Sequence, residues 1–301
     1  MFARPLALAA TALLVGAATP TPAGLPKGRP IAELTAACAG KSGYTDPAPP
    51  VKVFANVYYV GTCGISSVLI ASAEGHILID AGPREAAPLV AANIQALGFK
   101  LGDVKWIVTS HEHHDHVGGV AELKRLTGAQ VAGNAAAKLA LEQGKVEWRD
   151  PQPRDDPWPP VAVERVLQDG EHLVLGPLDL TLHTTPGHTT NSSTWTWRSC
   201  EGATCRNMVY ADSVTAVSSD GYKFSEHRVM VDAFARSLGK IAALPCDILL
   251  TPHPGASNLF DRLAGKVPLV DPDACIGYAE DAQAALEKRV KEEGTSGGAG
   301  K

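Results

Sequence analysis

The sequence of 301 residues lacks any concentrated block of positive charge. Its 27 lysine and arginine residues are outnumbered by 32 aspartate and glutamate residues, which leaves a formal net charge of −5. No basic run is longer than a pair such as Lys288 and Arg289. Because nucleic-acid-binding surfaces concentrate Lys and Arg on one face to neutralise phosphates, this balance argues against a nucleic-acid partner.

The sequence also lacks a segment that could cross a membrane, since even the apolar run near its beginning is too short. Later apolar runs fall well short of the roughly 20 residues that a spanning helix needs. The chain begins with one positive side chain, Arg4, and an apolar run over residues 5–18 that ends in small residues. This order predicts a secretory signal peptide over residues 1–23, with cleavage between Ala18 and Ala23; a buried N-terminal helix is the alternative. We therefore expect a periplasmic protein with no membrane partner after cleavage.

No Cys-x-x-Cys pair is present, which argues against a metal held by cysteines. The number of cysteines is even in a chain predicted to be exported, so we expect disulfide bonds, with reduced core cysteines as the alternative. The sequence alone does not fix the pairing, although Cys200 and Cys205 are close enough to close a small loop. The six positions are Cys38, Cys63, Cys200, Cys205, Cys246 and Cys275.

The composition is that of a globular protein. Glycine, proline and apolar residues occur near their average frequencies, which excludes collagen, coiled coil and disorder, and 45% hydrophobic residues can bury a substantial core. The patterning predicts strands at residues 51–60, 66–71, 76–80, 104–109, 161–167, 178–184, 207–210 and 247–250, and helices at residues 84–97, 120–127, 135–143 and 273–292. Because strands and helices interleave without a detectable repeat, we predict a single α/β domain over residues 24–293.

Two segments fall outside these elements. Residues 150–160 are rich in proline and are predicted to be a long surface loop, with an interdomain linker as the alternative. Residues 294–301 are predicted to be a disordered tail after the final helix.

Histidines and carboxylates are concentrated in residues 110–119, directly after a predicted strand. Four of the ten histidines lie there. In an extended backbone His111 and His113 point the same way and can reach one ion, while Asp115 and His116 can turn toward a second ion nearby. The segment predicts a metal site, against the alternative of a polar loop that is rich in histidine by chance.

Two single histidines occupy similar positions further along the chain. His188 follows the strand predicted at residues 178–184, and His253 follows the strand predicted at residues 247–250. Loops beyond strand ends are where an α/β active site built on a rigid sheet collects its residues. Three strand ends could therefore supply ligands to one site.

Taken together, this spaced signature resembles that of the metallo-β-lactamase superfamily. It comprises His111, His113, Asp115 and His116, with Asp80 upstream and His188 and His253 downstream. The resemblance runs from about Val51 to the final helix, and it implies a four-layer αβ/βα sandwich in a single domain.

Within the superfamily, three segments are most similar to the third subclass of class B β-lactamases. These are residues 59–65, residues 210–213 and residues 244–257, the last of which resembles the region that carries the final zinc ligand of that subclass. The resemblance implies two zinc ions, the first held by His111, His113 and His188 and the second by Asp115, His116 and His253. It also implies disulfides between Cys38 and Cys63, Cys200 and Cys205, and Cys246 and Cys275.

One position separates this subclass from superfamily members that hydrolyse thioesters or lactones. Those enzymes usually carry a bridging aspartate, and alignment of residues 209–213 on the family's strand places Ser213, rather than Asp212, at that position. Because neighbouring residues of a regular strand face opposite ways, Asp212 and Ser213 cannot both face the metals along such a strand. We therefore expect Ser213, together with Thr215, to hold a water or the substrate carboxylate.

Three further residues near the signature receive supporting roles. Asp80 is expected to hydrogen-bond the zinc site from outside the ligands, with a simple turn aspartate before Gly82 as the alternative. His114, at a spacer position, is expected to line the pocket wall. Glu112 is expected to be a solvated carboxylate or one that supports the ligands.

The function implied by the resemblance is periplasmic, zinc-dependent hydrolysis of the amide bond of β-lactam antibiotics such as penicillins, cephalosporins and carbapenems. A metal-bound hydroxide would attack the lactam carbonyl, oriented by Asp115, and the reaction would confer antibiotic resistance. We expect a monomer that acts on a small molecule.

The sequence leaves three alternatives to this function. The first is a hydrolase of the same fold that acts on a lactone or thioester, and the second is a secreted zinc-binding protein without activity. The third is a serine β-lactamase, because Ser237 and Lys240 match the Ser-x-x-Lys motif of those enzymes. The companion Ser-Asp-Asn and Lys-Thr-Gly motifs are absent from the sequence. The match also fits the end of a helix closed by Gly239.

Overall fold

The computed structural model describes residues 24–152 and 156–296. The signal peptide predicted over residues 1–23 lies outside the described residues, as do residues 297–301 of the predicted tail. None of the described helices is long and apolar enough to cross a membrane.

Two β-sheets form the centre of the described part of the chain. The first has seven strands, in the order β1 (Val51–Phe54), β2 (Val57–Tyr59), β3 (Val68–Ser72), β4 (Gly75–Ile79), β5 (Val104–Val108), β6 (Gln130–Gly133) and β7 (Arg165–Val166). The second has five, in the order β12 (Ile248–Leu250), β11 (Thr204–Tyr210), β10 (Ser193–Glu201), β9 (Leu178–Thr184) and β8 (His172–Leu175). Neighbouring strands are antiparallel from β1 to β4 and parallel from β4 to β7, and in the second sheet only β11 and β12 are parallel.

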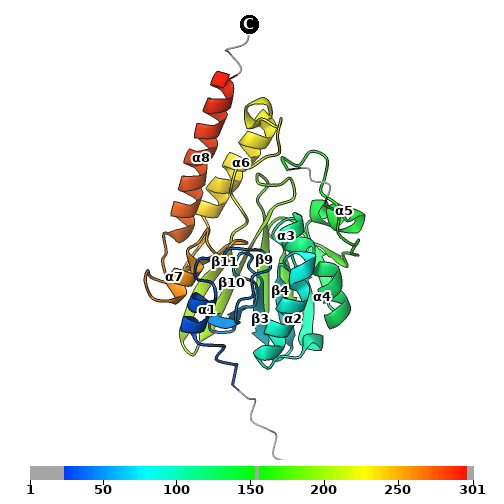
Figure 1. The fold of residues 1–301 in the computed structure, drawn as a ribbon, viewed down its shortest axis with the longest axis vertical. Coiled ribbons are helices and arrows are strands. Elements are labelled where there is room, and N and C mark those ends of the chain that lie inside the picture. The colour runs from blue at the N-terminus through cyan, green and yellow to red at the C-terminus, as the bar shows by residue number, and fades with distance from the viewer. Residues whose placement is uncertain (1–23, 153–155, 297–301) are drawn as a thin grey trace, which may run out of the picture.

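The alternation of side chains along the strands creates the layers. Ile77 and Ile79 of β4 join the core between the two sheets, while Leu78 of the same strand faces helices on the outer side. Those helices are α2 (Ala87–Ala96), α4 (Val120–Thr127) and α5 (Ala135–Gln143), seen beside the first sheet in Figure 1. The second sheet is covered by α6 (Arg228–Ala242) and α8 (Ala274–Ser296). A third hydrophobic core lies between these helices and the sheet. This confirms the predicted four-layer αβ/βα sandwich.

Short helices and turns connect these layers. They are α1 (Ile31–Ala37), α3 (His114–Val117) and α7 (Leu259–Leu263), with 3-10 turns at Arg84–Ala86, Leu101–Asp103 and Phe224–Glu226. The helix predicted at residues 135–143 has the predicted bounds, because the Asn134 side chain accepts hydrogen bonds from the amides of Ala136 and Ala137 and Gly144 ends the helix with a φ of 69°.

The strand predicted over residues 51–60 is wrong, since the chain reverses there and forms the hairpin of β1 and β2. Val51 pairs with Tyr59, and the turn between the strands places Ala55 at a φ of 47°. Asn56 stabilises the turn, because its side-chain amide donates to the carbonyl of Ala71 on the neighbouring strand. The turn has alanine and asparagine in place of glycine. Because the flanking apolar residues alternate as they would in one continuous strand, the sequence pattern did not reveal this turn.

The segment predicted as a strand over residues 161–167 is mostly irregular, and only β7 pairs in the sheet. Val161 donates its amide to the carbonyl of Leu141 in α5, and Glu164 donates to Val131 of β6. The apolar run therefore packs along a helix end and a sheet edge. Strands β8 and β10 were not among the predicted strands, although Trp195 and Trp197 of β10 alternate in a strand-like way.

Two helices continue past the glycines expected to end them. Gly239 lies inside α6, whose last turn is anchored by Lys240, because its ammonium binds Asp169 and the carbonyl of Thr184. In α8 the helix passes Gly294 and ends at Ser296, so that part of the predicted tail is helical. Its end is held by Glu293, whose carboxylate accepts a hydrogen bond from the amide of Ser225 at 2.8 Å.

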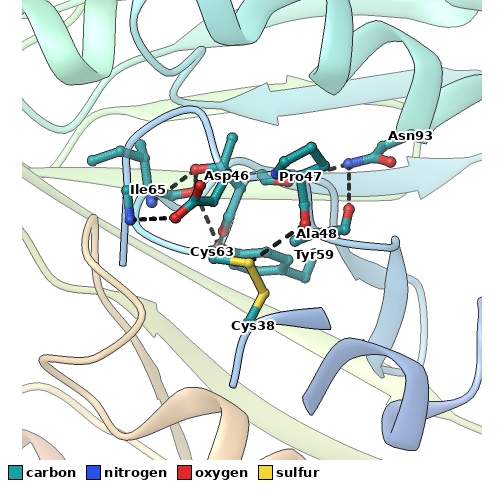
Figure 2. Close-up of a disulfide and its surroundings, with 11 residues drawn as sticks. Cys38, Asp46, Pro47, Ala48, Tyr59, Cys63, Ile65 and Asn93 are labelled. Carbon is teal, nitrogen blue, oxygen red and sulfur yellow. Dashed lines mark hydrogen bonds between the residues drawn. A yellow bond between two sulfur atoms is a disulfide. The ribbon is translucent and has the colours of Figure 1, made fainter. Parts of the chain in front are cut away.

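The three predicted disulfides are confirmed. Cys38 pairs with Cys63, Cys200 with Cys205 and Cys246 with Cys275, and no cysteine in the described residues is free. The first pair ties α1 to the loop after β2, and the amide of Cys63 in that loop donates a hydrogen bond to the carbonyl of Asp46 (Figure 2). The Asn93 side chain supports the same region from α2 through the carbonyl of Ala48.

We predict that the disulfides differ in their contribution to stability because they close loops of different length. Removal of Cys38–Cys63, which spans 25 residues, should lower the free energy of unfolding by about 3.5 kcal/mol, and removal of Cys200–Cys205, which spans 5, by about 2 kcal/mol. Denaturant unfolding of the two double alanine variants measures both losses. Equal losses, or a larger loss for the short loop, would contradict the loop-closure account.

Candidate metal centre

The candidate site lies in a cavity of about 330 Å³ at the ends of three strands from both sheets. His111 and His113 follow β5, His188 follows β9, and His253 follows β12. The short helix α3 begins after His113 and carries Asp115 and His116. Other residues line the cavity around them, namely Tyr44, His114, Val146, Gln152, Asp156, Trp158, Thr215 and Val217.

The structure brings the six predicted ligands together as two triplets. The first comprises His111, His113 and His188, and the second comprises Asp115, His116 and His253. Within each triplet the candidate ligand atoms lie within 4.8 Å of one another. The rings of His111 and His116 are 4.3 Å apart between centroids, so the two triplets are adjacent.

In the first triplet, one nitrogen of each imidazole is held by an acceptor from another part of the chain. Asp212 Oδ1 lies 2.8 Å from His111 Nδ1, and Asp150 Oδ1 lies 3.2 Å from His113 Nε2. The carbonyl of Thr215 accepts a hydrogen bond from His188 Nδ1 at 2.8 Å. Because a neutral imidazole has one donor and one acceptor nitrogen, each contact leaves a lone pair on the opposite nitrogen.

The second triplet is arranged in the same way. His253 Nδ1 donates to the carbonyl of Gly64 at 3.2 Å, and Asp80 Oδ2 lies 3.4 Å from His116 Nδ1. Asp80 is itself held by hydrogen bonds from the amide and hydroxyl of Ser110, each at 2.7 Å. Asp80 thus lies outside the two triplets and beside His116, and its supporting role toward a metal stays a prediction.

The inward-facing nitrogens fit a metal. His111 Nε2 is buried and has no hydrogen-bond partner in the described part of the chain. A buried polar atom without a partner costs free energy, and a metal ion supplies the missing interaction. The nitrogen and carboxylate donors of both triplets are those that zinc prefers.

The protonation states of the two triplets differ. Burial, with smaller effects of the neighbouring imidazoles, lowers the pKa of His111 well below its usual value and that of His188 to about 3, so both are neutral near pH 7. Burial alone would also lower the pKa of His116, but the carboxylates of Asp115 and Asp80 raise it to about 10. Burial alone would raise the pKa of Asp115, but His116 and His253 hold it well below its usual range.

A proton on His116 therefore occupies the second triplet when no ion is bound. Its Nε2 lies 3.3 Å from Asp115 Oδ2, and His253 Nε2 lies 3.5 Å from the same oxygen. The raised pKa means that this proton is present at neutral pH and is lost only as the pH rises through about 10. A metal at the second triplet must displace it.

We predict that zinc binding releases this proton. At pH 6, zinc at the second triplet should release about one proton more from the wild-type protein than from a His116→Gln variant. Calorimetric titrations in buffers of different ionisation enthalpy count the protons. Equal proton release by the two proteins would show that His116 is neutral before metal binds.

Asp212 has a role that the sequence interpretation did not assign to it. Strand β11 ends at Tyr210, so the alternation of a regular strand does not extend to Asp212 and Ser213. Asp212 is fully buried, and its Oδ1 contacts His111 on the ring edge opposite the inward-facing nitrogen. Ser213 is buried but does not line the cavity, whereas Thr215 does. The substrate contacts of Ser213 and Thr215 stay predictions.

Two further carboxyl groups surround His113. Asp150 was assigned only to a surface loop, yet it is buried and bonded to His113, and no residue pattern in the sequence singled it out. Glu112 is also buried, which excludes the solvated alternative, and burial together with Asp150 and Asp212 raises its pKa well above the usual value. His114 lines the cavity as expected.

We predict that Asp150 sets the metal affinity of the first triplet. An Asp150→Ala variant should bind its first zinc about 10–100-fold more weakly, because His113 loses the acceptor that orients its ring. Asp150→Asn, which keeps an acceptor oxygen, should lose less. Competition with a chelating dye measures the affinity.

The matched control for this prediction is Asp179→Ala. Asp179 contacts His172 Nδ1 at 2.6 Å in the same kind of pair, but both side chains are more than half exposed and lie on the hairpin of β8 and β9. Its removal should leave zinc affinity unchanged. Equal effects at both positions would contradict a specific role for Asp150.

Comparison with known proteins gives three findings. The model of the metallo-beta-lactamase superfamily matches residues 60–201. The solved metallo-β-lactamase MIM-1 from Novosphingobium pentaromativorans is 51% identical, with a TM-score of 0.85 over 88% of this chain and 98% of that chain. MEM-A1, a subclass B3 metallo-β-lactamase from a soil metagenome library, is 42% identical, with a TM-score of 0.81 over 84% of this chain and 100% of that chain.

A curated relative is named for a hydrolase other than a β-lactamase. The hydroxyacylglutathione hydrolase of Pseudomonas syringae pv. syringae is 29% identical over 168 residues, which are 56% of this chain and 53% of that protein. The chain thus spans about half of the length of this curated relative.

Proposed function

Because the chain belongs to the metallo-β-lactamase superfamily, we propose that it is a zinc β-lactamase that hydrolyses the amide bond of β-lactam antibiotics. The observation that carries this proposal is the position of Asp212. A carboxylate at this point of the sequence could bridge two ions in a thioester hydrolase, but here it is held at 2.8 Å against the outer edge of His111. This contact supports an arrangement of the two triplets without a bridging aspartate, which is the one expected for the third β-lactamase subclass.

The catalytic power of this site depends on metal. Zinc ions held by the first and second triplets would supply Lewis acidity and lower the pKa of a coordinated water toward about 7. The residues present fit two ions, since each triplet keeps its lone pairs directed inward through acceptors on the opposite ring edges.

Asp115 is the residue of the chain placed to orient the attacking water. Its carboxylate lies beside His116 and His253, lines the cavity and stays ionised because those imidazoles hold its pKa low. An ionised carboxylate at this position can accept a hydrogen bond from the water and so orient it toward the lactam carbonyl.

Other side chains shape the space for the substrate. Tyr44 lies over the second triplet with its ring 5.8 Å from that of His253, and Trp158 also lines the cavity. Both offer apolar surface to the substrate. We assign Thr215 to the substrate carboxylate, since its hydroxyl lies 3.2 Å from His188 Nδ1 at the cavity wall.

The serine β-lactamase alternative finds no support in this geometry. The hydroxyl of Ser237 donates to the carbonyls of Pro186 at 2.7 Å and Ala233 at 3.0 Å. Lys240 is engaged by Asp169. Ser237 anchors α6 to the loop of His188, and Lys240 anchors it to Asp169 and the end of β9, so neither is placed to act as a nucleophile or its base.

We further propose that the enzyme acts in the periplasm as a monomer with two zinc ions and no nucleic-acid partner, and that it confers resistance to β-lactams. The features that support export are the signal-like first residues and the three disulfides, which persist in oxidising compartments.

The decisive measurement is carbapenem hydrolysis by the zinc-loaded protein taken from the periplasmic fraction of cells that express the full chain. A chelator should abolish turnover and added zinc should restore it. Asp115→Asn should lower kcat by about 10²-fold or more, because the carboxylate that orients the attacking water is lost. Asp179→Asn serves as the control and should leave kcat unchanged.

The second candidate is a thioester hydrolase, which the curated relative favours. A hydroxyacylglutathione thioester assayed beside the β-lactams distinguishes the two activities. Turnover of the thioester with no turnover of any β-lactam by fully zinc-loaded protein would sink the β-lactamase proposal.

A further inference from the structure

A second cavity, of about 910 Å³, lies next to the metal centre. It shares no lining residue with the metal-centre cavity. A wall separates the two, formed where residues 150–152 meet residues 217–222 and closed by a hydrogen bond from the amide of Ser219 to the carbonyl of Pro151 at 2.9 Å. The second cavity is therefore a compartment of its own.

The second cavity has an apolar lining that is open to solvent. Its apolar residues are Trp148, Pro186, Tyr222, Val229, Met230 and Ala233. Trp148 is 76% exposed and Val229 is 83% exposed, although both are large hydrophobic residues. Its volume falls in the range of roughly 300–1,000 Å³ that holds small ligands, and exposed apolar patches of this kind mark binding sites.

Two arginines supply positive charge at this cavity. Arg228 begins α6, is exposed, and makes no hydrogen bond or ion pair with the residues that the structure describes. The guanidinium of Arg149 lies 4.8 Å from the ring centroid of Trp148, and its Nη1 is paired with Glu147 Oε1 at 3.5 Å. Of the two acidic lining residues, Glu226 is paired with Lys223 and Asp150 is bonded to His113. The uncompensated charge is thus that of Arg228.

We propose that the second cavity is a binding site for a small aromatic anion, a carboxylate or sulfonate carried on a ring system. The ring lies against Trp148 and Met230, and the anionic group pairs with Arg228. Aromatic surface and a guanidinium together recognise this chemistry, because the apolar wall accepts the ring and the unpaired cation accepts the charge. The site is separate from the substrate position in the metal centre.

The test uses the fluorescent aromatic sulfonate 1-anilinonaphthalene-8-sulfonate and the zinc-loaded protein. The probe should bind with enhanced emission and quench tryptophan fluorescence. Arg228→Gln should weaken its affinity by about fivefold, the size of one partly exposed ion pair. Arg236→Gln removes an exposed arginine from the same helix, two turns further along and outside the cavity, and should leave the affinity unchanged.

A second variant tests the cavity itself. Ala233→Phe places a ring in the space and should reduce probe binding by more than tenfold, while zinc content and far-UV circular dichroism verify the fold. Probe affinity that is the same in Arg228→Gln and Ala233→Phe as in the wild-type protein would overturn the proposal. So would binding that disappears when zinc is removed and ignores both variants, since the probe would then sit on the metals. Because binding is read without turnover, the result is independent of the substrate.

Discussion

The metal centre depends on a single constraint, which is that each buried imidazole must present its lone pair inward. That orientation is not a property of histidine itself, since either ring nitrogen can carry the proton. Here it is imposed from behind by groups that come from distant parts of the chain: Asp212 and Thr215 after β11, Asp150 from the loop after α5, and Gly64 from the loop after β2. The two sheets matter because they bring these acceptors and the strand-end histidines into register. Without the supporting acceptors the six ligands would still be close together, but they would not be oriented as ligands.

The six ligands could be found from the sequence because they follow the ends of predicted strands at characteristic spacings. Four of the ligands lie within six consecutive residues, namely His111, His113, Asp115 and His116. Such a local pattern can be recognised from the sequence alone. The acceptors behind them could not be found in this way. Asp150 is 37 residues from the histidine that it holds, and the acceptor for His253 is a backbone carbonyl, which has no signature in any sequence.

The fold, like the ligands, could be predicted where the determining pattern is local in the sequence. Hydrophobic periodicity identified α5 and β9, where the pattern repeats over several residues, while the layered architecture was implied by the family resemblance. It failed where a tertiary contact overrode a local signal. Gly239 and Gly294 would end isolated helices, but Lys240 and Glu293 anchor the following turns to other parts of the molecule. At residues 51–60 the hairpin turn lacked the glycine that marks most reversals.

The loop that contains Cys63 links redox chemistry to metal binding. The disulfide with Cys38 fixes this loop, and the carbonyl of Gly64, the next residue, orients His253. Closure of that sulfur bond restricts the backbone on which the orientation of the His253 ring depends. A cross-link between two side chains that do not line the metal-centre cavity thus helps to set the direction of a candidate metal ligand.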